Sequence, residues 1–108
     1  MLCSVATRIE RSGVNFDRTV LVNGSTVLKC DTVGVPRPVI TWYKDGRPLT
    51  LGSLTSVRLL QDGAKLKIES ANLSHSGTYE CRAENDAGHD RVHYRLRVLG
   101  QSAVLVAF

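Results

Sequence analysis

Residues 74–88, with the sequence SHSGTYECRAENDAG, decide the fold of this chain. Within them Tyr79, Cys81 and Ala83 alternate with polar residues, which is the period-two pattern of a strand with one buried face. Gly77 stands at the start of this pattern and Gly88 follows it, so we expect a turn on each side. The stretch therefore predicts a strand over residues 77–84 whose buried face carries a cysteine.

Outward from this strand, the chain divides into short strand-like segments separated by turn residues. The other strands are expected at residues 7–12, 16–22, 25–32, 39–44, 47–49, 57–60, 64–69 and 89–99. Gly34, Pro36 and Pro38 are expected to keep regular strand out of the segment between them. No stretch shows a convincing helical period. Turns roughly every 8–12 residues predict an all-β, two-sheet antiparallel sandwich.

Several short motifs resemble the immunoglobulin superfamily, most closely its intermediate (I-set) domains. The motifs are Leu28-x-Cys30, Gly34-x-Pro36-x-Pro38, Trp42-Tyr43-Lys44-Asp45-Gly46, Leu66-x-Ile68, Tyr79-x-Cys81 and Ala83-x-Asn85-x-x-Gly88. A tyrosine two residues before the second cysteine is the tyrosine-corner arrangement of such domains. The resemblance implies one I-set domain over residues 7–99. Residues 1–6 are then a disordered or cloning-derived terminus, and residues 100–108 a linker or tail.

The resemblance also implies a buried disulfide between Cys30 and Cys81 that joins the two sheets. The core residues that it implies around this bond are Trp42, Tyr79, Leu66 and Ile68. Neither cysteine has a second cysteine or histidine at metal-ligand spacing, so a structural role is favoured over a metal site. Cys3 is left over, and we interpret it as a free terminal thiol rather than an intermolecular bridge.

Length and composition limit the class of protein. The chain has 108 residues, of which 43% are hydrophobic and 22% charged, as in one soluble globular domain. Its first residues are too few for a signal peptide, so we interpret it as a fragment of a longer protein. No apolar run approaches the roughly 20 residues of a membrane helix, so no membrane insertion is expected.

The sequence offers no chemistry of the kind that enzymes need. We find no nucleophile–base pattern, no glycine-rich phosphate loop and no cluster of metal ligands, so we expect no catalysis, cofactor or metal. There is no helix that could enter a DNA groove and no aromatic pair of the RNA-binding type. Nucleic-acid binding is therefore not expected.

The outward face of the last predicted strand carries the basic row Arg91, His93, Arg95 and Arg97. Glu80 and Glu84 on the neighbouring strand face the same way, so cross-strand ion pairs that neutralise the row are favoured. The alternative is an anion-binding stripe for a sulfated glycan or an acidic protein, extended by Arg82 and Lys44. The partner-binding residues that we expect are Tyr43, Glu80, Arg82, Arg91, Arg95 and Arg97, with the turn at residues 85–88.

Two acceptor triplets for N-glycosylation begin at Asn23 and Asn72. Both fall in predicted turns, where an acceptor belongs, and together they favour a secreted protein. The alternative is that each asparagine only stabilises its own turn.

His75 departs from the I-set pattern. The resemblance implies an aspartate at this position, paired with the arginine that Arg58 matches. Arg58 is therefore expected to find another carboxylate, such as Asp62, or the corner lacks this ion pair. We expect His75 to be a neutral surface histidine rather than a pH sensor.

The resemblance implies a non-catalytic protein-binding and spacer module of a multidomain cell-adhesion or extracellular matrix protein. Its partners would be neighbouring immunoglobulin domains and adhesion or matrix proteins. The runs at residues 34–38 and 45–49 resemble those of hemicentin-type matrix proteins. Two alternatives stay open: an intracellular sarcomeric or cytoskeletal I-set module, and a heparin-binding or sulfated-glycan-binding module that uses the basic row.

Overall fold

The computed structural model describes residues 3–49 and 56–100. The elements in chain order are β1 (Val5–Ile9), β2 (Asp17–Leu21), β3 (Thr26–Lys29), β4 (Thr32–Val35), β5 (Val39–Lys44), β6 (Arg47–Pro48), β7 (Val57–Leu60), β8 (Lys65–Ile68), a single 3-10 turn η1 (Leu73–His75), β9 (Gly77–Asn85) and β10 (Gly88–Leu99). The central strand predicted from the Tyr-x-Cys motif is β9, and it lies between β10 and β5.

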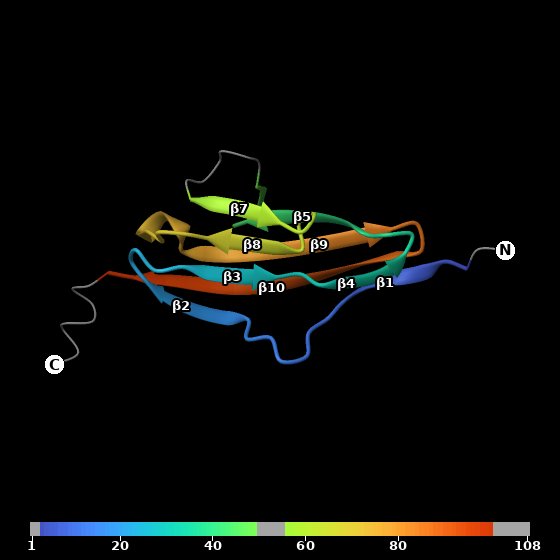
Figure 1. Cartoon of the computed structure of the whole chain (residues 1–108), viewed down its shortest axis with the longest axis horizontal. Coiled ribbons are helices and arrows are strands. Elements are labelled where there is room, and N and C mark those ends of the chain that lie inside the picture. Colours follow the sequence, from blue (N-terminus) through green and yellow to red (C-terminus); the bar gives the residue numbers. More distant parts are fainter. Residues whose placement is uncertain (1–2, 50–55, 101–108) are drawn as a thin grey trace.

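The strands form two layers packed face to face (Figure 1). One layer is the five-stranded sheet β2-β10-β9-β5-β6. The other contains the three-stranded sheet β3-β8-β7 and the pair β1-β4, because β3 and β4 follow one another along the chain. The predicted all-β sandwich is confirmed, with one difference: β2 and β10 pair in parallel. The chain passes from β1 to β2 without reversing its direction, so β2 runs in the same direction as β10.

The first strand begins earlier than the sequence predicted. β1 starts at Val5, so residues 5 and 6 belong to the fold and not to the disordered terminus that was expected for residues 1–6. The reason is a contact from the other end of the chain, because the Asn85 side-chain amide donates to the carbonyl of Val5 at 2.8 Å and to that of Pro36 at 2.9 Å. Contrary to prediction, strand β4 passes through Gly34, because it pairs with β1. A Cβ atom there would lie 2.9 Å from the Asn85 amide nitrogen.

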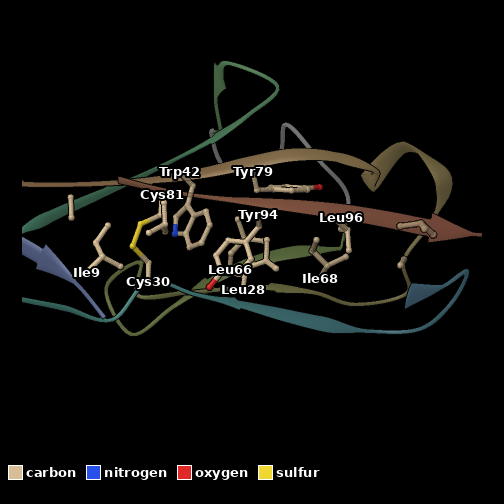
Figure 2. Packing of buried hydrophobic residues seen from close by; sticks show 14 residues of the cluster. Ile9, Leu28, Cys30, Trp42, Leu66, Ile68, Tyr79, Cys81, Tyr94 and Leu96 are labelled. Atoms are coloured by element: carbon tan, nitrogen blue, oxygen red, sulfur yellow. A yellow bond between two sulfur atoms is a disulfide. The ribbon is translucent and has the colours of Figure 1, made fainter. Parts of the chain in front are cut away.

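The core lies between the layers, with the disulfide toward one end of it, near Ile9 and Trp42 (Figure 2). Cys30 and Cys81 are bonded, with their Cα atoms 6.4 Å apart. The residues that the sequence assigned to the surrounding core, all of them 0–1% exposed, are Trp42, Tyr79, Leu66 and Ile68. The disulfide thus joins β9 in one sheet to the junction of β3 and β4 in the other layer.

Tyr79 forms the tyrosine corner. Its hydroxyl donates to the carbonyl oxygen of His75 at 2.5 Å, and burial raises the pKa of Tyr79 so that the hydroxyl stays protonated. Replacing Tyr79 by phenylalanine removes this buried hydrogen bond, so we expect the free energy of unfolding to fall by about 1–2 kcal/mol. Urea denaturation measures the change. Tyr94→Phe is the comparison, because its hydroxyl donates to Lys29 from a less enclosed site and should cost less.

Candidate protein-binding face

The predicted partner-binding residues meet on the outward side of the five-stranded sheet. In β10 the residues alternate between exposed and buried along nearly the whole strand, and in register Tyr43 lies beside Glu80 and Glu80 beside His93. We call the outward side chains of β5, β9 and β10 the outer sheet face. It is positioned by the core beneath it, because each buried residue of β9 and β10 directs its neighbours outward.

Glu80 is the centre of this face. Although it points away from the core, it is only 7% exposed, because the side chains around it cover it. Its carboxylate accepts a hydrogen bond from Arg82 Nε at 3.0 Å and lies 3.9 Å from an Arg91 nitrogen and 3.6 Å from His93 Nε2. The hydrogen bond from Arg82 is the main reason why the pKa of Glu80 is lowered, despite its partial desolvation. Arg82 in turn stacks on the Tyr43 ring at 4.1 Å from its centroid.

The predicted basic row is split by these contacts. In one half, Arg91 and His93 form cross-strand ion pairs with Glu80. Arg95 and Arg97 have no carboxylate within 4.0 Å in the part of the chain that the structure describes. They line a groove of about 240 Å³ at the β2 edge. Lys44 does not extend the row, because it forms an ion pair with Asp45 at 2.9 Å.

The opposite end of the outer sheet face is hollowed by a larger groove of about 550 Å³. Its residues come from β5, β9 and β10 and are Val39, Thr41, Tyr43, Arg82, Ala83, Glu84, His89, Asp90 and Arg91. Val39 is 71% exposed there, which is unusual for an aliphatic residue in a strand. The groove therefore combines an apolar surface, an aromatic–arginine stack and charged groups, as protein-binding surfaces do.

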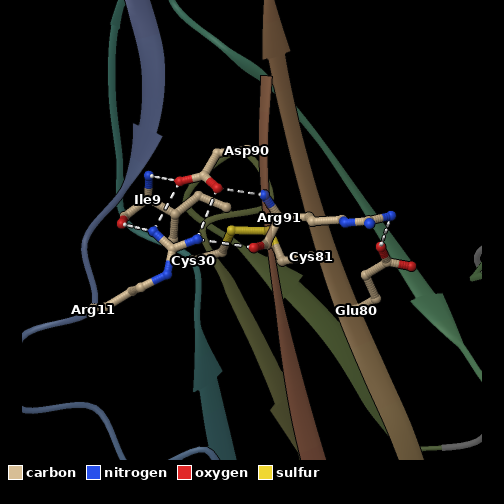
Figure 3. Close-up of polar contacts among 7 residues, drawn as sticks. All are labelled: Ile9, Arg11, Cys30, Glu80, Cys81, Asp90 and Arg91. Atoms are coloured by element: carbon tan, nitrogen blue, oxygen red, sulfur yellow. Dashed lines mark hydrogen bonds and ion pairs between the residues drawn. A yellow bond between two sulfur atoms is a disulfide. The ribbon is translucent and has the colours of Figure 1, made fainter. Parts of the chain in front are cut away.

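A clamp between Arg11 and Asp90 was missed by sequence reasoning (Figure 3). The Asp90 carboxylate accepts two hydrogen bonds from Arg11, at 2.7 and 2.9 Å, and one each from the backbone N–H groups of Ile9 and Arg91. Arg11 also donates to the carbonyl oxygens of Ile9 and Arg91. The clamp fastens the end of β1 to β10, and no local pattern could reveal it because its partners are 79 residues apart.

The Arg11 guanidinium holds the pKa of Asp90 well below its usual range, so the clamp stabilises the fold only while Asp90 is ionised. Stability should fall as the pH drops below the ordinary aspartate pKa of about 4. Asp90→Asn should lower the free energy of unfolding by about 1–2 kcal/mol at pH 7. The deficit relative to wild type should shrink toward pH 3, as measured by urea denaturation across pH.

The matched control for this variant is Glu10→Gln. Glu10 pairs with Arg8 at 3.1 Å on the same segment, but both side chains are exposed, so the loss should stay below about 0.5 kcal/mol. An Asp90→Asn deficit that is constant from pH 7 to pH 3 would contradict the linkage between this carboxylate and stability.

Both candidate glycosylation residues lie in exposed turns at one end of the sandwich. Asn23 has a positive φ of 72° in the turn between β2 and β3, and its N–H donates to the Ala71 carbonyl. Asn72 is the N-cap of η1, where its side-chain oxygen accepts from the Ser74 N–H at 2.9 Å. Each asparagine therefore shapes its own turn, and glycosylation of either remains a prediction.

The prediction of a surface position for His75 is wrong, because this residue is 0% exposed. Its Nδ1 accepts a hydrogen bond from the backbone N–H of Asn72 at 3.0 Å, which closes a capping box around η1. The histidine thus has a local structural role where the family pattern has an aspartate. The usual capping-box signature has Glu or Gln three residues after the N-cap, so a histidine at this position gave no such signal in the sequence.

Arg58 pairs with a different carboxylate from the one suggested by the sequence. It lies 3.6 Å from Glu69, the residue that follows the adjacent strand β8, whereas Asp62 pairs with Arg37 at 2.9 Å. The register of β7 and β8 decides this, since Arg58 lies opposite Lys67, two residues before Glu69.

The remaining expectations concern chemistry and membranes. Among residues 3–49 and 56–100, no three histidine, cysteine or acidic side chains gather as metal ligands. Over the same ranges, the structure has no helix with the length and apolar character of a membrane span. Cys3 is a free, exposed thiol.

Comparison with known proteins places these features in a family. The family model described as "Immunoglobulin I-set domain" matches residues 12–98. Human hemicentin-1 is 46% identical over 90 residues, which cover 83% of this chain and 2% of hemicentin-1. The muscle M-line assembly protein unc-89 of Caenorhabditis elegans is 34% identical over 88 residues, which cover 82% of this chain and 1% of that protein. The chain thus spans only a small part of these relatives.

The solved structures agree with the sequence relatives. Extracellular domains 3–5 of Drosophila OTK match with a TM-score of 0.78 and 27% identity, covering 88% of this chain and 32% of that one. This likeness agrees with the two-layer sandwich of this chain. The chain therefore belongs to the immunoglobulin I-set family, whose members are structural and adhesion domains and not enzymes.

Proposed function

We propose that this domain is a protein-binding and spacer module of a multidomain cell-adhesion or extracellular matrix protein. The observation that supports it most is the outer sheet face, where an ordered Tyr43–Arg82 stack and an exposed Val39 border a groove of about 550 Å³. Aromatic and arginine side chains on a rigid surface are typical of binding hot spots. The partners that we propose are adjacent immunoglobulin domains and adhesion or matrix proteins.

The spacer role is supported by the path of the chain. β1 lies at one end of the sandwich and β10 ends at the other, so the polypeptide enters and leaves at opposite poles (Figure 1). Domains arranged in this way can be joined in a row without folding the chain back. The Cys30–Cys81 bond links the two layers covalently, so each domain in such a row resists unfolding.

An extracellular location is the second part of this proposal. The disulfide and the two acceptor triplets in exposed turns favour it. The alternative is an intracellular sarcomeric module, which the likeness to the muscle M-line assembly protein unc-89 supports. Mass spectrometry of the protein from its natural source decides between them. We expect an oxidised Cys30–Cys81 pair and sugar on Asn23 or Asn72, whereas reduced cysteines without sugar would favour the intracellular module.

Binding through the outer sheet face is tested with a recombinant array of hemicentin-1 immunoglobulin domains as the probe. Arg82→Ala removes the stack on Tyr43 and should weaken binding by about tenfold or more, measured by biolayer interferometry. Arg58→Ala is the control, because it also removes one positive charge, but from β7 in the other layer. Equal losses in the two variants would show that net charge, and not this face, accounts for the binding.

A second candidate function is binding of sulfated glycans, favoured by the two arginines without a carboxylate partner among the described residues, Arg95 and Arg97. Their positions two residues apart on β10 place the guanidinium groups on the same side of the strand. The double variant Arg95→Glu/Arg97→Glu should elute from a heparin column at clearly lower salt than wild type. Elution unmoved by this charge reversal would dismiss glycan binding at this site.

A further inference from the structure

The charges of the outer sheet face that have no ion-pair partner lie at its two ends and have opposite signs. Glu84 and Asp86 lie where β9 ends and turns into β10, and neither has a cation within 4.0 Å among the described residues. Arg95 and Arg97 lie toward the far end of β10. Between them, Glu80 holds Arg82, Arg91 and His93 in ion pairs, so the charged side chains in the middle of the face already have partners within the same copy.

Both ends are grooves of opposite net charge. The acidic groove, of about 490 Å³, is lined by Pro36, Arg37, Val39, Glu84, Asn85 and Asp86. Because Arg37 is neutralised by Asp62, two negative charges remain there. The basic groove, lined by Asp17, Arg18, Thr19, Arg95 and Arg97, carries three arginines and one aspartate, which leaves two positive charges.

The spacing of these charges follows from the strand register. Glu84 lies beside His89 on β10, and Arg95 lies six residues further along the same strand. At about 3.3 Å per residue, the acidic and basic ends are about 20 Å apart. Arg95 lies beside Thr78, so the midpoint between the two ends falls between Glu80 and Arg82.

We infer that the outer sheet face binds a second copy of this chain in antiparallel orientation. The inference rests on the proposed protein-binding role of this face and names its partner. The two-fold axis would lie in the plane of the interface and perpendicular to the strands. It would cross β9 between Glu80 and Arg82. This axis places β9 of each copy over β9 of the other, so that Glu80 faces Arg82 of the second copy, and Thr41 faces Tyr43.

The same axis brings the two charged ends together. Glu84 of one copy lies at the level of Arg95 of the other, and Asp86 at the level of Arg97. Each contact occurs twice, as in any interface with two-fold symmetry. A second copy suits this surface better than an unrelated partner, because the two ends carry two acidic and two basic side chains at matching distances from one midpoint. The face is small, so the dimer belongs to the weak, transient class of interfaces.

Reciprocal charge reversal tests the inference directly. Sedimentation equilibrium at about 0.15 M salt, where long-range repulsion between the positively charged copies is screened, should show a reversible wild-type dimer. Glu84→Lys alone and Arg95→Glu alone each bring like charges together twice and should weaken self-association by about tenfold or more. An equimolar mixture of the two variants should dimerise as wild type does, because the two reversed charges then face each other at one contact and the native Glu84–Arg95 pair forms at the other.

The controls are Glu69→Lys and Arg58→Glu, which make the same charge changes on the other layer and should leave self-association unchanged. Far-UV circular dichroism checks that every variant is folded. A mixture that fails to restore the dimer would overturn the inference, and so would a wild-type protein that stays monomeric at about 1 mM. If that monomer still loses binding to the hemicentin-1 array on Arg82→Ala, the proposed function stands and only the self-association is refuted.

Discussion

Replacing both Cys30 and Cys81 by alanine is expected to lower the free energy of unfolding by about 4 kcal/mol. The bond joins residues 51 positions apart, and a crosslink over a loop of that length removes much of the entropy of the unfolded chain. Small domains are stable by only about 5–15 kcal/mol, so the variant should unfold at much lower urea concentration. Urea denaturation followed by far-UV circular dichroism measures the change.

Cys3→Ser is the matched control for this variant, because Cys3 is a free, exposed thiol and its replacement should change the stability by less than about 0.5 kcal/mol. Adding reductant to the wild-type protein should reproduce most of the loss seen in the double variant. A double variant as stable as wild type would show that packing alone holds the two layers together.

The second large effect is expected for Trp42→Ala, which should cost about 3–5 kcal/mol. Trp42 is 1% exposed, its ring centroid is 6.3 Å from that of Tyr94, and its indole N–H donates to the carbonyl of Gly63 at 2.7 Å. Gly63 lies in the turn between β7 and β8, so this hydrogen bond connects the two layers. The substitution removes the hydrogen bond and leaves a cavity beside the disulfide.

Trp42→Phe separates the two contributions. It keeps an aromatic ring in the core but loses the N–H donor, so we expect a smaller cost, about 2 kcal/mol. Leu59→Ala is the control for apolar truncation at an exposed position in the other layer. Circular dichroism is the measurement of choice, because the only tryptophan of the chain is lost in both variants. A cost below about 1 kcal/mol for Trp42→Ala would contradict the central place of the indole in the core.

Strands with one buried face were predicted well from the sequence. The expected range for β5 agrees with the structure at both ends, because its alternation of covered and exposed residues is a local property that neighbouring residues reveal. The range of β7 also agrees, although three of its four residues are exposed. The first strand was misplaced because Asn85, which fixes its start, is 80 residues away from Val5.

The sequence predicted which residues lie on the outer sheet face, but not which ion pairs they form. Alternation along β10 correctly placed the basic row on the outward side. The register between β9 and β10 was needed to show that Glu80 pairs with Arg91 and His93 and leaves Arg95 and Arg97 without a carboxylate. The burial of Glu80 follows from the same register, since side chains on three adjacent strands cover it.

For this protein, the order of residues was enough to establish the all-β sandwich and, through its resemblance to the I-set family, the cysteine pair and the core around the tryptophan. Those features depend on the period of two along single strands and on short motifs. The three-dimensional arrangement was required for the Arg11–Asp90 clamp, the buried His75 and the division of charge along the outer sheet face. Each of these depends on which side chains from separate segments come within about 4 Å, and that distance follows from packing and register.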